Sequence, residues 1–214
     1  MVSFSTIHLR KQAMKTETVG IIGAGAIGQA FARQLVNSGL NVILSNSRGP
    51  DSLAEVVNAL GDRARAGTVQ QAAEAGIVFV STNWSSTEAA LSGLSWSGRI
   101  LIDATNPVIL PGFTLAELGG KNSSQVMTQW APGARVVKAF NTLLASVLAQ
   151  DPAQAGGRRV VFISGDDAGA KSEVEALAAR MGFATIDLGS LETGGHLQQF
   201  PGGPLPALNL VKLA

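Results

Sequence analysis

The sequence predicts an α/β fold in which helices cover both faces of a doubly wound, mostly parallel sheet. Two observations lead to this expectation. Short apolar runs rich in Val and Ile alternate with helix-length segments, which is the pattern of parallel strands joined by crossover helices. The first apolar run is followed by a glycine-rich turn and an amphipathic helix, a combination that opens many sheets of this class.

The individual elements follow from local signals along the chain. Gly39 ends the first helix, Pro50 opens the second, and Ser85 or Ser86 is expected to cap the fourth. The expected strands are 18–22, 41–45, 64–68, 76–81, 99–103, 134–139, 158–164 and 183–188. The expected helices are 26–38, 51–60, 69–74, 85–91, 122–130, 142–149 and 167–181.

Two stretches are predicted to be irregular. Residues 104–120 contain Asn106-Pro107 and Pro111-Gly112, dipeptides that interrupt regular structure. The segment from Leu191 onward is rich in Gly and Pro and is predicted to be a loop. His196 lies in this segment and is expected either to be solvated or to line a cleft.

The glycine-rich turn has the spacing of a dinucleotide site. Gly23 allows a tight turn out of the strand, Gly25 lets the backbone approach a pyrophosphate, and Gly28 lets helix and strand pack closely. The helix that follows points free N–H groups and its positive dipole end at the phosphates. The alternative is a tight strand–helix turn without a ligand. The context favours a Rossmann dinucleotide-binding domain.

The end of the second strand predicts which dinucleotide binds. NAD-binding proteins usually place Asp or Glu there for the ribose 2′-hydroxyl, whereas this chain reads Asn46, Ser47 and Arg48, with Asp51 as the nearest acid. Ser47 can donate a hydrogen bond to a 2′-phosphate, and Arg48 offers a fork of charged donors. The sequence therefore predicts NADP, and the alternative is that Arg48 is a solvated loop residue.

We expect three segments. Residues 1–17 are predicted to be a disordered leader without the apolar core of a signal peptide. Residues 18–150 are the predicted dinucleotide-binding domain. Residues 151–214 are expected to be a small α/β extension that shares the sheet and completes the substrate cleft. No run approaches the roughly 18 apolar residues of a membrane span, so we expect no membrane and a cytoplasmic location.

The composition excludes several chemistries. The sequence contains no Cys and no Tyr, so it offers neither a thiolate nucleophile nor a tyrosine proton donor. Its 2 histidines have no acidic neighbours at metal-ligand spacing, so we expect no metal site. The 16 Lys and Arg against 15 Asp and Glu form no basic stripe, so nucleic acid is not an expected partner.

Three later loops are expected to meet the cofactor at the carboxyl ends of the strands. Thr82 and Asn83 follow the fourth strand, Asn106 the fifth, and Ala139 and Asn141 the sixth. Their amides and hydroxyls can bind ribose and the nicotinamide carboxamide.

Five other residues carry open or weaker predictions. Trp84 is expected to wall the cofactor or to pack beneath its loop, whereas Trp96 and Trp130 are expected to pack. Lys138 is either a catalytic cation or a salt-bridge partner, with the second favoured, and Asp103 is expected to cap the turn that follows it.

The predicted loops contain no obvious general acid, and we assign no catalytic residue. Reduction of a ketone or imine normally requires a Lys, His or Tyr near the carbon that accepts hydride. Hydride transfer to another redox ring requires mainly stacking and alignment. The sequence therefore favours a small-molecule redox ring as the acceptor.

Taken together, these residues resemble the NADPH-dependent coenzyme F420 reductases (F420H2:NADP oxidoreductases), over about residues 18–214. A similar nucleotide domain occurs in the cytosolic part of the six-transmembrane metalloreductases. The motifs that carry the resemblance are 20–28, 45–50, 103–107, 136–142, 165–167 and 202–204.

The resemblance implies where the cofactor lies. Ala24 to Ile27, which include Ala26, would hold the pyrophosphate, and Ser47 with Arg48 the 2′-phosphate. Residues 139–142 would face the nicotinamide, with the ring of the acceptor stacked beyond them. The implied acceptor is a deazaflavin (coenzyme F420) or a flavin, and the implied assembly is a homodimer.

Two departures from the family pattern concern acceptor handling. Asn83 stands where the family usually has Pro before Trp84, and Asn141 stands where archaeal members have His. The leading hypothesis is an NADPH-dependent oxidoreductase that passes hydride to F420 or a flavin-like ring. One alternative is a reductase of small imines or carbonyls, whose usual helical second domain is longer than the chain after residue 155. The other is a non-catalytic NADP(H)-sensing module.

Overall fold

Consecutive Val, Ile and Leu residues place apolar side chains on both faces of a strand. Such strands form the centre of one large sheet, because burying both faces removes the most apolar surface from water. The computed structural model describes residues 18–213. The strands of the large sheet are β1 (Thr18–Ile22), β2 (Asn41–Ser45), β3 (Ala64–Ala66), β4 (Ile77–Val80), β5 (Ile100–Asp103), β8 (Arg135–Ala139), β9 (Ala153–Gln154), β10 (Gly157–Gly165), β11 (Ala184–Asp187) and β12 (Val211–Leu213).

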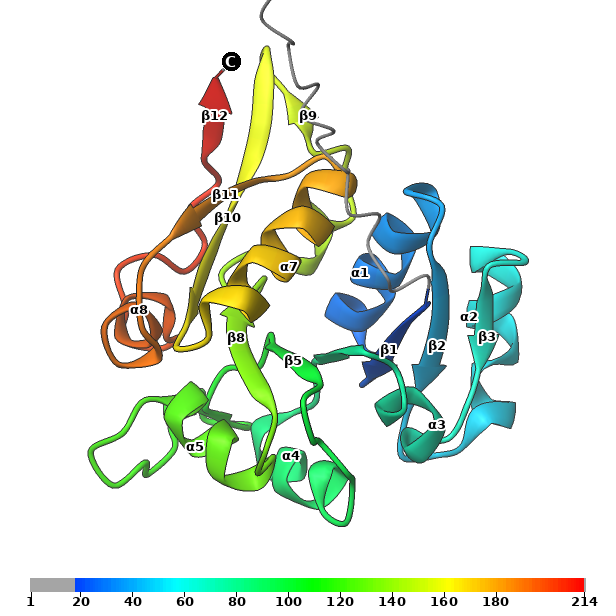
Figure 1. The fold of residues 1–214 in the computed structure, drawn as a ribbon, viewed down its shortest axis with the longest axis horizontal. Coiled ribbons are helices and arrows are strands. Elements are labelled where there is room, and N and C mark those ends of the chain that lie inside the picture. The colour runs from blue at the N-terminus through cyan, green and yellow to red at the C-terminus, as the bar shows by residue number, and fades with distance from the viewer. Residues whose placement is uncertain (1–17, 214) are drawn as a thin grey trace, which may run out of the picture.

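The main path across the sheet is β11-β10-β8-β5-β4-β1-β2-β3 (Figure 1). Neighbours from β8 to β3 pair in parallel, whereas β10 pairs antiparallel with β8. Strands β9 and β12 flank the first residues of β10. The predicted α/β fold with a doubly wound, mostly parallel sheet is confirmed. Residues after 150 extend this same sheet.

The helices are η1 (Pro50–Leu53, a 3-10 turn), α1 (Ala26–Asn37), α2 (Ala54–Leu60), α3 (Val69–Ala73), α4 (Trp84–Leu91), α5 (Ser123–Trp130), α6 (Ala145–Leu148), α7 (Ala168–Arg180) and α8 (Leu191–Gln198). Residues of α1, α2, α6 and α7 join one buried cluster, in which Phe31 stacks on Phe79 at 3.8 Å between ring centroids. Residues of α3, α4, α5 and α8 join the cluster on the other face. The two clusters leave the strand ends free to carry loops.

The prediction of a loop from Leu191 onward is wrong for Leu191–Gln198, which form α8, and is confirmed for residues 199–210. Ser190 caps this helix by accepting a hydrogen bond from the Thr193 N–H. A Cβ on Gly194 would lie 2.5 Å from the Cβ of Ser164. The glycines that suggested a loop instead allow a helix to pack very close to β10.

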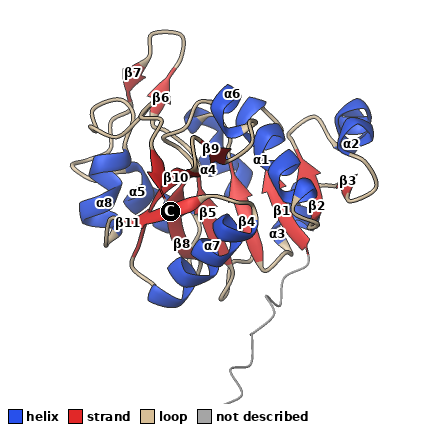
Figure 2. Cartoon of the chain, turned by 90° about the horizontal axis from the view of Figure 1, so that it is seen from above, coloured by secondary structure: helices blue, strands red, loops and turns tan. Residues whose placement is uncertain are grey.

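Other boundaries also differ from expectation. Residues 104–120 are not wholly irregular, since β6 (Val108–Ile109) and β7 (Thr114–Leu115) pair as an antiparallel hairpin. Figure 2 shows this hairpin projecting from the body of the molecule. Helix α4 begins at Trp84 after Asn83, which makes no side-chain cap bond, so the predicted serine cap is wrong. Strand β12 was not expected. The predicted leader, residues 1–17, and His8 lie outside the described residues.

Candidate active site

The sheet order reverses between β1 and β4, where the chain runs to β2 on one side and to β5 on the other. In parallel sheets this switch point is where ligands bind, at the carboxyl ends of the strands. Here Gly23 follows β1 and Ser81 follows β4, and the Ser81 hydroxyl donates to the Gly23 carbonyl oxygen at 2.9 Å. The glycine-rich turn is thus fixed at the switch point.

The three glycines of the turn serve different purposes. Gly23 has a φ of +108°, which disfavours any side chain. A Cβ on Gly28 would lie 1.9 Å from the Gly23 carbonyl oxygen, so helix and strand could not approach. A Cβ on Gly25 would meet no protein atom within 4 Å. Packing does not explain that glycine, whereas the close approach of a phosphate does.

The N-terminus of α1 fits a pyrophosphate. Gly25 is its N-cap, no side chain caps it, and no acidic residue lies in its first turn. The first N–H groups of an α-helix have no partner within the helix. Ala26 and Ile27 therefore present donors and the positive dipole end to the space beside Gly25.

The loop after β2 is shaped by its own side chains. Asn46 Oδ1 accepts from the Arg48 N–H at 2.9 Å, and Asn46 Nδ2 donates to the Ser52 hydroxyl at 2.9 Å. Ser47 and Arg48 are exposed. The Arg48 guanidinium makes no hydrogen bond or ion pair with another described residue, so its donors are available to an anion. The hydrogen bonds of the Asn46 side chain therefore fix the shape of this loop.

These residues enclose a cleft of about 640 Å³, here called the Arg48 cleft. It contains eight of the predicted cofactor residues: Gly23, Ala24, Gly25, Asn46, Ser47, Arg48, Thr82 and Asn83. Its opposite wall was not predicted and consists of residues of α3, of α4 and of the loop after α4, among them Val69, Gln70, Ser86, Ala90 and Leu94. Nothing in the local sequence marks that wall, because only the folded sheet brings it across from the β2 loop.

A second cleft of about 350 Å³ continues from the first and is here called the Trp84 cleft. The two share Gly25 and the residues Ser81 to Asn83. The predicted residues in the Trp84 cleft are Gly25, Ala26, Ile27, Thr82, Asn83, Trp84 and Asn106. A dinucleotide seated at the glycine turn would therefore extend in one direction toward Arg48 and in the other toward Trp84.

The packing expected of Trp84 is confirmed, and its role as a wall of the cofactor stays a prediction. It lines the Trp84 cleft and is only 7% exposed. Its ring packs against Trp130 at 4.7 Å between centroids. Trp96 is buried. Thr82 bonds to Thr87 through their hydroxyls at 2.8 Å, which ties the cleft floor to α4.

Ala139 and Asn141 do not line either cleft, in contrast to the prediction that they face the cofactor. Both are buried. Asn141 Nδ2 donates to Asn106 Oδ1 at 3.0 Å, and Asn106 Nδ2 donates to the Asn141 carbonyl oxygen at 3.0 Å. Phe140, which lies between Ala139 and Asn141 in the chain, has a φ of +65°, a sparsely populated conformation for a bulky residue. The residues after β8 thus form the support of the wall, and Asn106 forms its surface.

Lys138 and Asp103 form a buried ion pair, with 3.2 Å between Nζ and Oδ2. This agrees with the favoured salt-bridge role of Lys138. Asp103 also caps its turn as expected, since Oδ1 accepts from the Thr105 N–H at 2.9 Å. His196 is exposed on α8 and lines neither cleft.

The mouth of the Trp84 cleft is apolar, and sequence reasoning missed it. Val108, Leu110 and Phe113 from the β6–β7 hairpin line it together with Phe200. Phe113 is 67%, Leu110 55% and Phe200 42% exposed. Apolar residues on both sides of Pro111-Gly112, consecutive in 108–110 and alternating in 113–115, were the signal for this hairpin. Large apolar side chains exposed at a cleft indicate a ligand that covers them.

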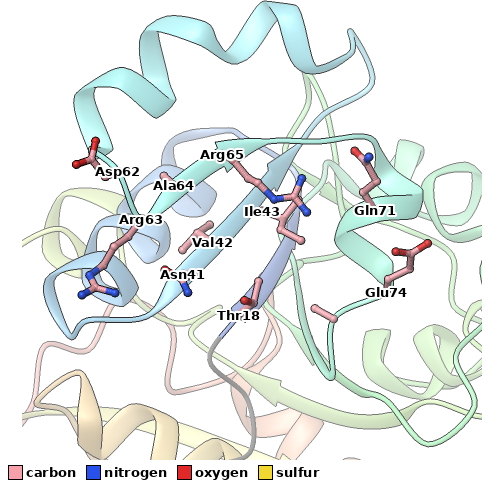
Figure 3. A pocket seen from close by; sticks show the side chains of 11 residues that line it. Thr18, Asn41, Val42, Ile43, Asp62, Arg63, Ala64, Arg65, Gln71 and Glu74 are labelled. Atoms are coloured by element: carbon pink, nitrogen blue, oxygen red, sulfur yellow. The ribbon is translucent and has the colours of Figure 1, made fainter.

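A third cleft, of about 450 Å³, lies at the opposite end of the strands. Thr18 and Asn41, the first residues of β1 and β2, line it with Arg63, Arg65 and Glu74 (Figure 3). Its charges have both signs, and it lies away from the carboxyl ends where parallel sheets bind cofactors. Among residues 18–213, no three His, Asp or Glu side chains lie together as a metal site would require. Within the same range, no helix has the length and apolarity to cross a membrane.

Comparison with known proteins places the chain among reductases. The family model for coenzyme F420-dependent NADP oxidoreductases matches residues 18–107. A structure of a hypothetical protein, SMa0349 from Sinorhizobium meliloti, is 42% identical with a TM-score of 0.85, covering 91% of this chain and 95% of that one. A proposed F420-dependent NADP reductase from Arthrobacter sp. FB24 is 27% identical with a TM-score of 0.71, covering 86% of this chain and 89% of that one.

A curated relative extends the comparison to a longer protein. Metalloreductase STEAP3 of Rattus norvegicus is 31% identical over 95% of this chain, but the match covers 39% of that protein. This chain thus spans about two fifths of the curated relatives it matches. With the glycine turn, the Arg48 loop and these matches in agreement, residues 18–107 form a domain of the coenzyme F420-dependent NADP oxidoreductase family.

Proposed function

We propose that this protein transfers hydride between NADP(H) and a planar redox ring, a deazaflavin such as coenzyme F420 or a flavin. The observation that carries the proposal is the character of the Trp84 cleft. None of its lining residues titrates near neutral pH, and its mouth is made by Val108, Leu110, Phe113 and Phe200. Such a wall suits the face of an aromatic ring.

The cofactor would lie along both clefts. The first turn of α1 would hold the pyrophosphate, and Ser47 with Arg48 the 2′-phosphate. The dihydronicotinamide supplies the hydride, and the oxidised product is NADP⁺. Asn83, Trp84 and Asn106 would place its ring against the acceptor and keep water away from both faces.

A ring acceptor fits the absence of a proton donor in the described part of the cleft. The acceptor would gain one hydride to give a stable reduced ring. The accompanying proton would come from water at the edge of that ring, not at the ring faces from which water is excluded. Reduction of a carbonyl or an imine would need a donor at the reacting atom. We therefore favour hydride transfer to a ring over the imine or carbonyl reductase.

The test is oxidation of NADPH at 340 nm with F420, FMN, FAD and riboflavin, and separately with a panel of ketones and imines. We expect turnover with at least one ring and none with the panel. Turnover with the panel alone would support the carbonyl or imine reductase. Tight NADPH binding without any oxidation would overturn the proposal that the protein is an enzyme, and it would support the NADP(H)-sensing module.

The homodimer is also a proposal, and it rests on the family resemblance. Equilibrium sedimentation of the purified chain tests it directly. A single species at the monomer mass of 22.0 kDa across micromolar concentrations would contradict it.

A further inference from the structure

A fully buried lysine lies directly behind the wall of the Trp84 cleft. The Lys138 Nζ donates to Asp103 Oδ2 at 3.2 Å and to the Thr105 carbonyl oxygen at 3.0 Å. It also donates to the Ser123 hydroxyl at 3.1 Å. An ammonium has three N–H groups, so all of them are used. Lys138 cannot give a proton to a ligand in this arrangement.

The carboxylate partner is equally occupied. Asp103 Oδ1 accepts from the Thr105 N–H at 2.9 Å and from its hydroxyl at 2.7 Å. Oδ2 accepts from the Ser124 hydroxyl at 2.6 Å as well as from Lys138. The pair therefore holds both the amide and the carbonyl of the residues that turn the chain after β5.

A second set of bonds continues this network to the C-terminal extension. Asn141 Nδ2 donates to the Gln198 carbonyl oxygen at 2.7 Å. The Ser164 hydroxyl donates to Gln198 Oε1 at 2.7 Å. Gln198 is fully buried, so α8 is fixed to β10 and to the residues after β8. The loop 104–106 is thus hydrogen-bonded to Asp103, Lys138 and Asn141.

The residues that line the Trp84 cleft differ from the buried residues that hold them in place. Ala104, Thr105 and Asn106 line the Trp84 cleft, whereas Lys138 and Asp103 do not and have no exposed side-chain surface. We propose that Lys138 and Asp103 are positioning residues, which fix the loop 104–106 so that the nicotinamide and the acceptor ring meet at hydride-transfer geometry. The inference rests on the proposed function, because its main readout is the rate of that transfer.

A buried ion pair also affects the stability of a protein, so the test must separate a positioning role from a purely structural one. Removal of Lys138 alone leaves a buried carboxylate without its cation, which destabilises a protein strongly. Removal of both charges avoids that penalty but still leaves the Thr105 carbonyl unheld. The single variant Lys138→Met and the double variant Asp103→Asn with Lys138→Met therefore differ in stability but share the loosened loop.

We expect Lys138→Met to lower both Tm and kcat. The double variant should recover much of the Tm while kcat stays at least about tenfold below wild type, the size of effect that small misalignments of reacting groups produce. Both variants should bind 2′,5′-ADP, which occupies only the Arg48 cleft, as the wild type does. Lys171→Met is the matched control, since Lys171 forms an ion pair with Asp187 away from both clefts and should keep kcat.

For the Lys138 and Asp103 variants, two results would overturn the proposal. One is a double variant with wild-type kcat, which would make the pair structural only. The other is a loss of 2′,5′-ADP affinity in parallel with kcat, which would indicate general misfolding. If Lys138→Met does not fold, Ser123→Ala removes one acceptor of Nζ and should lower kcat with unchanged 2′,5′-ADP affinity. An unchanged kcat in folded Ser123→Ala would also contradict it.

Failure of the proposed function gives a different pattern. If no acceptor allows the wild-type protein to oxidise NADPH, the positioning role is tested by binding measurements alone. The affinity advantage of NADPH over 2′,5′-ADP should then fall in the double variant and persist in Lys171→Met. An unchanged advantage would reject the positioning role independently of the reaction.

Discussion

The Arg48 cleft and the Trp84 cleft use their polar groups in opposite ways. In the Arg48 cleft the side chains of Ser47 and Arg48 are exposed to a ligand, and the first N–H groups of α1 lie beside Gly25, where the two clefts meet. In the Trp84 cleft Asn106 spends its amide on Asn141, and the surface that remains for a ligand is largely apolar. The first cleft is arranged to recognise charge, and the second to hold a shape.

This difference agrees with what each part of the proposed dinucleotide reductase must do. Phosphates are bound by charge-assisted hydrogen bonds, which need available donors. Hydride transfer needs two rings at a fixed distance, and internal hydrogen bonds provide that rigidity. The comparison predicts that substitutions in the Arg48 cleft change cofactor affinity, whereas substitutions in the Trp84 cleft change the rate or the acceptor.

The largest effect is expected in the glycine turn. In Gly28→Ala the new Cβ would lie 1.9 Å from the Gly23 carbonyl oxygen, so α1 must shift. Overpacking of this kind costs about 1–3 kcal/mol, or roughly 2–12 °C in Tm for a chain of this size. NADPH binding should be lost with it. Thermal melts and titration of NADPH fluorescence measure both quantities.

Gly25→Ala is the control that separates packing from binding. A Cβ there meets no protein atom, and the backbone is already at φ −74° and ψ −173°, which alanine adopts freely. We expect an unchanged Tm and an NADPH affinity that is lower by about tenfold or more, equivalent to at least about 1.4 kcal/mol. Wild-type affinity in Gly25→Ala would show that the phosphates do not approach this residue.

The next largest effect is expected at Arg48. Loss of charged hydrogen bonds to a phosphate costs about 1.5–3 kcal/mol, so Arg48→Ala should weaken NADPH binding about tenfold to a hundredfold. NADH binding should change little. Arg63→Ala is the matched control, because Arg63 is an exposed arginine at the opposite end of the strands. Isothermal titration gives both affinities, and equal losses for NADPH and NADH would reject the 2′-phosphate assignment.

The two clefts also differ in how far the sequence predicted them. Gly23 to Gly28 and Asn46 to Arg48 lie within two short segments, and each residue has a reason that its neighbours supply. Asn106 and Asn141 meet only because β5 and β8 are adjacent. Their pairing, and hence the burial of Asn141, depends on contacts 35 residues apart. Local patterns carry no information about such contacts.

Helix α8 is a second element that local sequence patterns did not predict, because its form depends on a distant contact. Gly194 and Gly195 indicated a loop because glycine weakens an isolated helix. In the folded chain Gly195 lies against Asn122, where a Cβ would be 2.7 Å from its side-chain nitrogen. The partner that requires the glycine is 73 residues away. The main sheet was predictable because its strands are apolar on both sides, a property that each strand shows by itself.

A smaller effect is expected at the mouth of the Trp84 cleft. Phe113→Ala removes an exposed ring that we propose contacts the acceptor. Aromatic contacts are worth about 0.5–1.5 kcal/mol, so KM for the acceptor should rise about two- to tenfold with unchanged NADPH affinity. Leu213→Ala is the control, because Leu213 is 68% exposed and lies outside both clefts. Steady-state kinetics with the best acceptor decides, and an unchanged KM would place the acceptor elsewhere.

The smallest effect is expected between acceptors that share a ring and differ in charge. Riboflavin and FMN have the same isoalloxazine, and only FMN carries a phosphate. No residue that lines the Trp84 cleft is charged, so this cleft offers no side chain to bind that phosphate. A cation on the phosphate would contribute about 1.5–3 kcal/mol, whereas a cleft that binds the ring alone should give kcat/KM values within about threefold of each other. A preference of more than tenfold for FMN would mean that a cation outside the lining, such as Lys121 on the loop before α5, reaches the bound acceptor. In that case the Trp84 cleft would also bind its ligand through charge where the acceptor enters, and the proposed contrast between the two clefts would be wrong there.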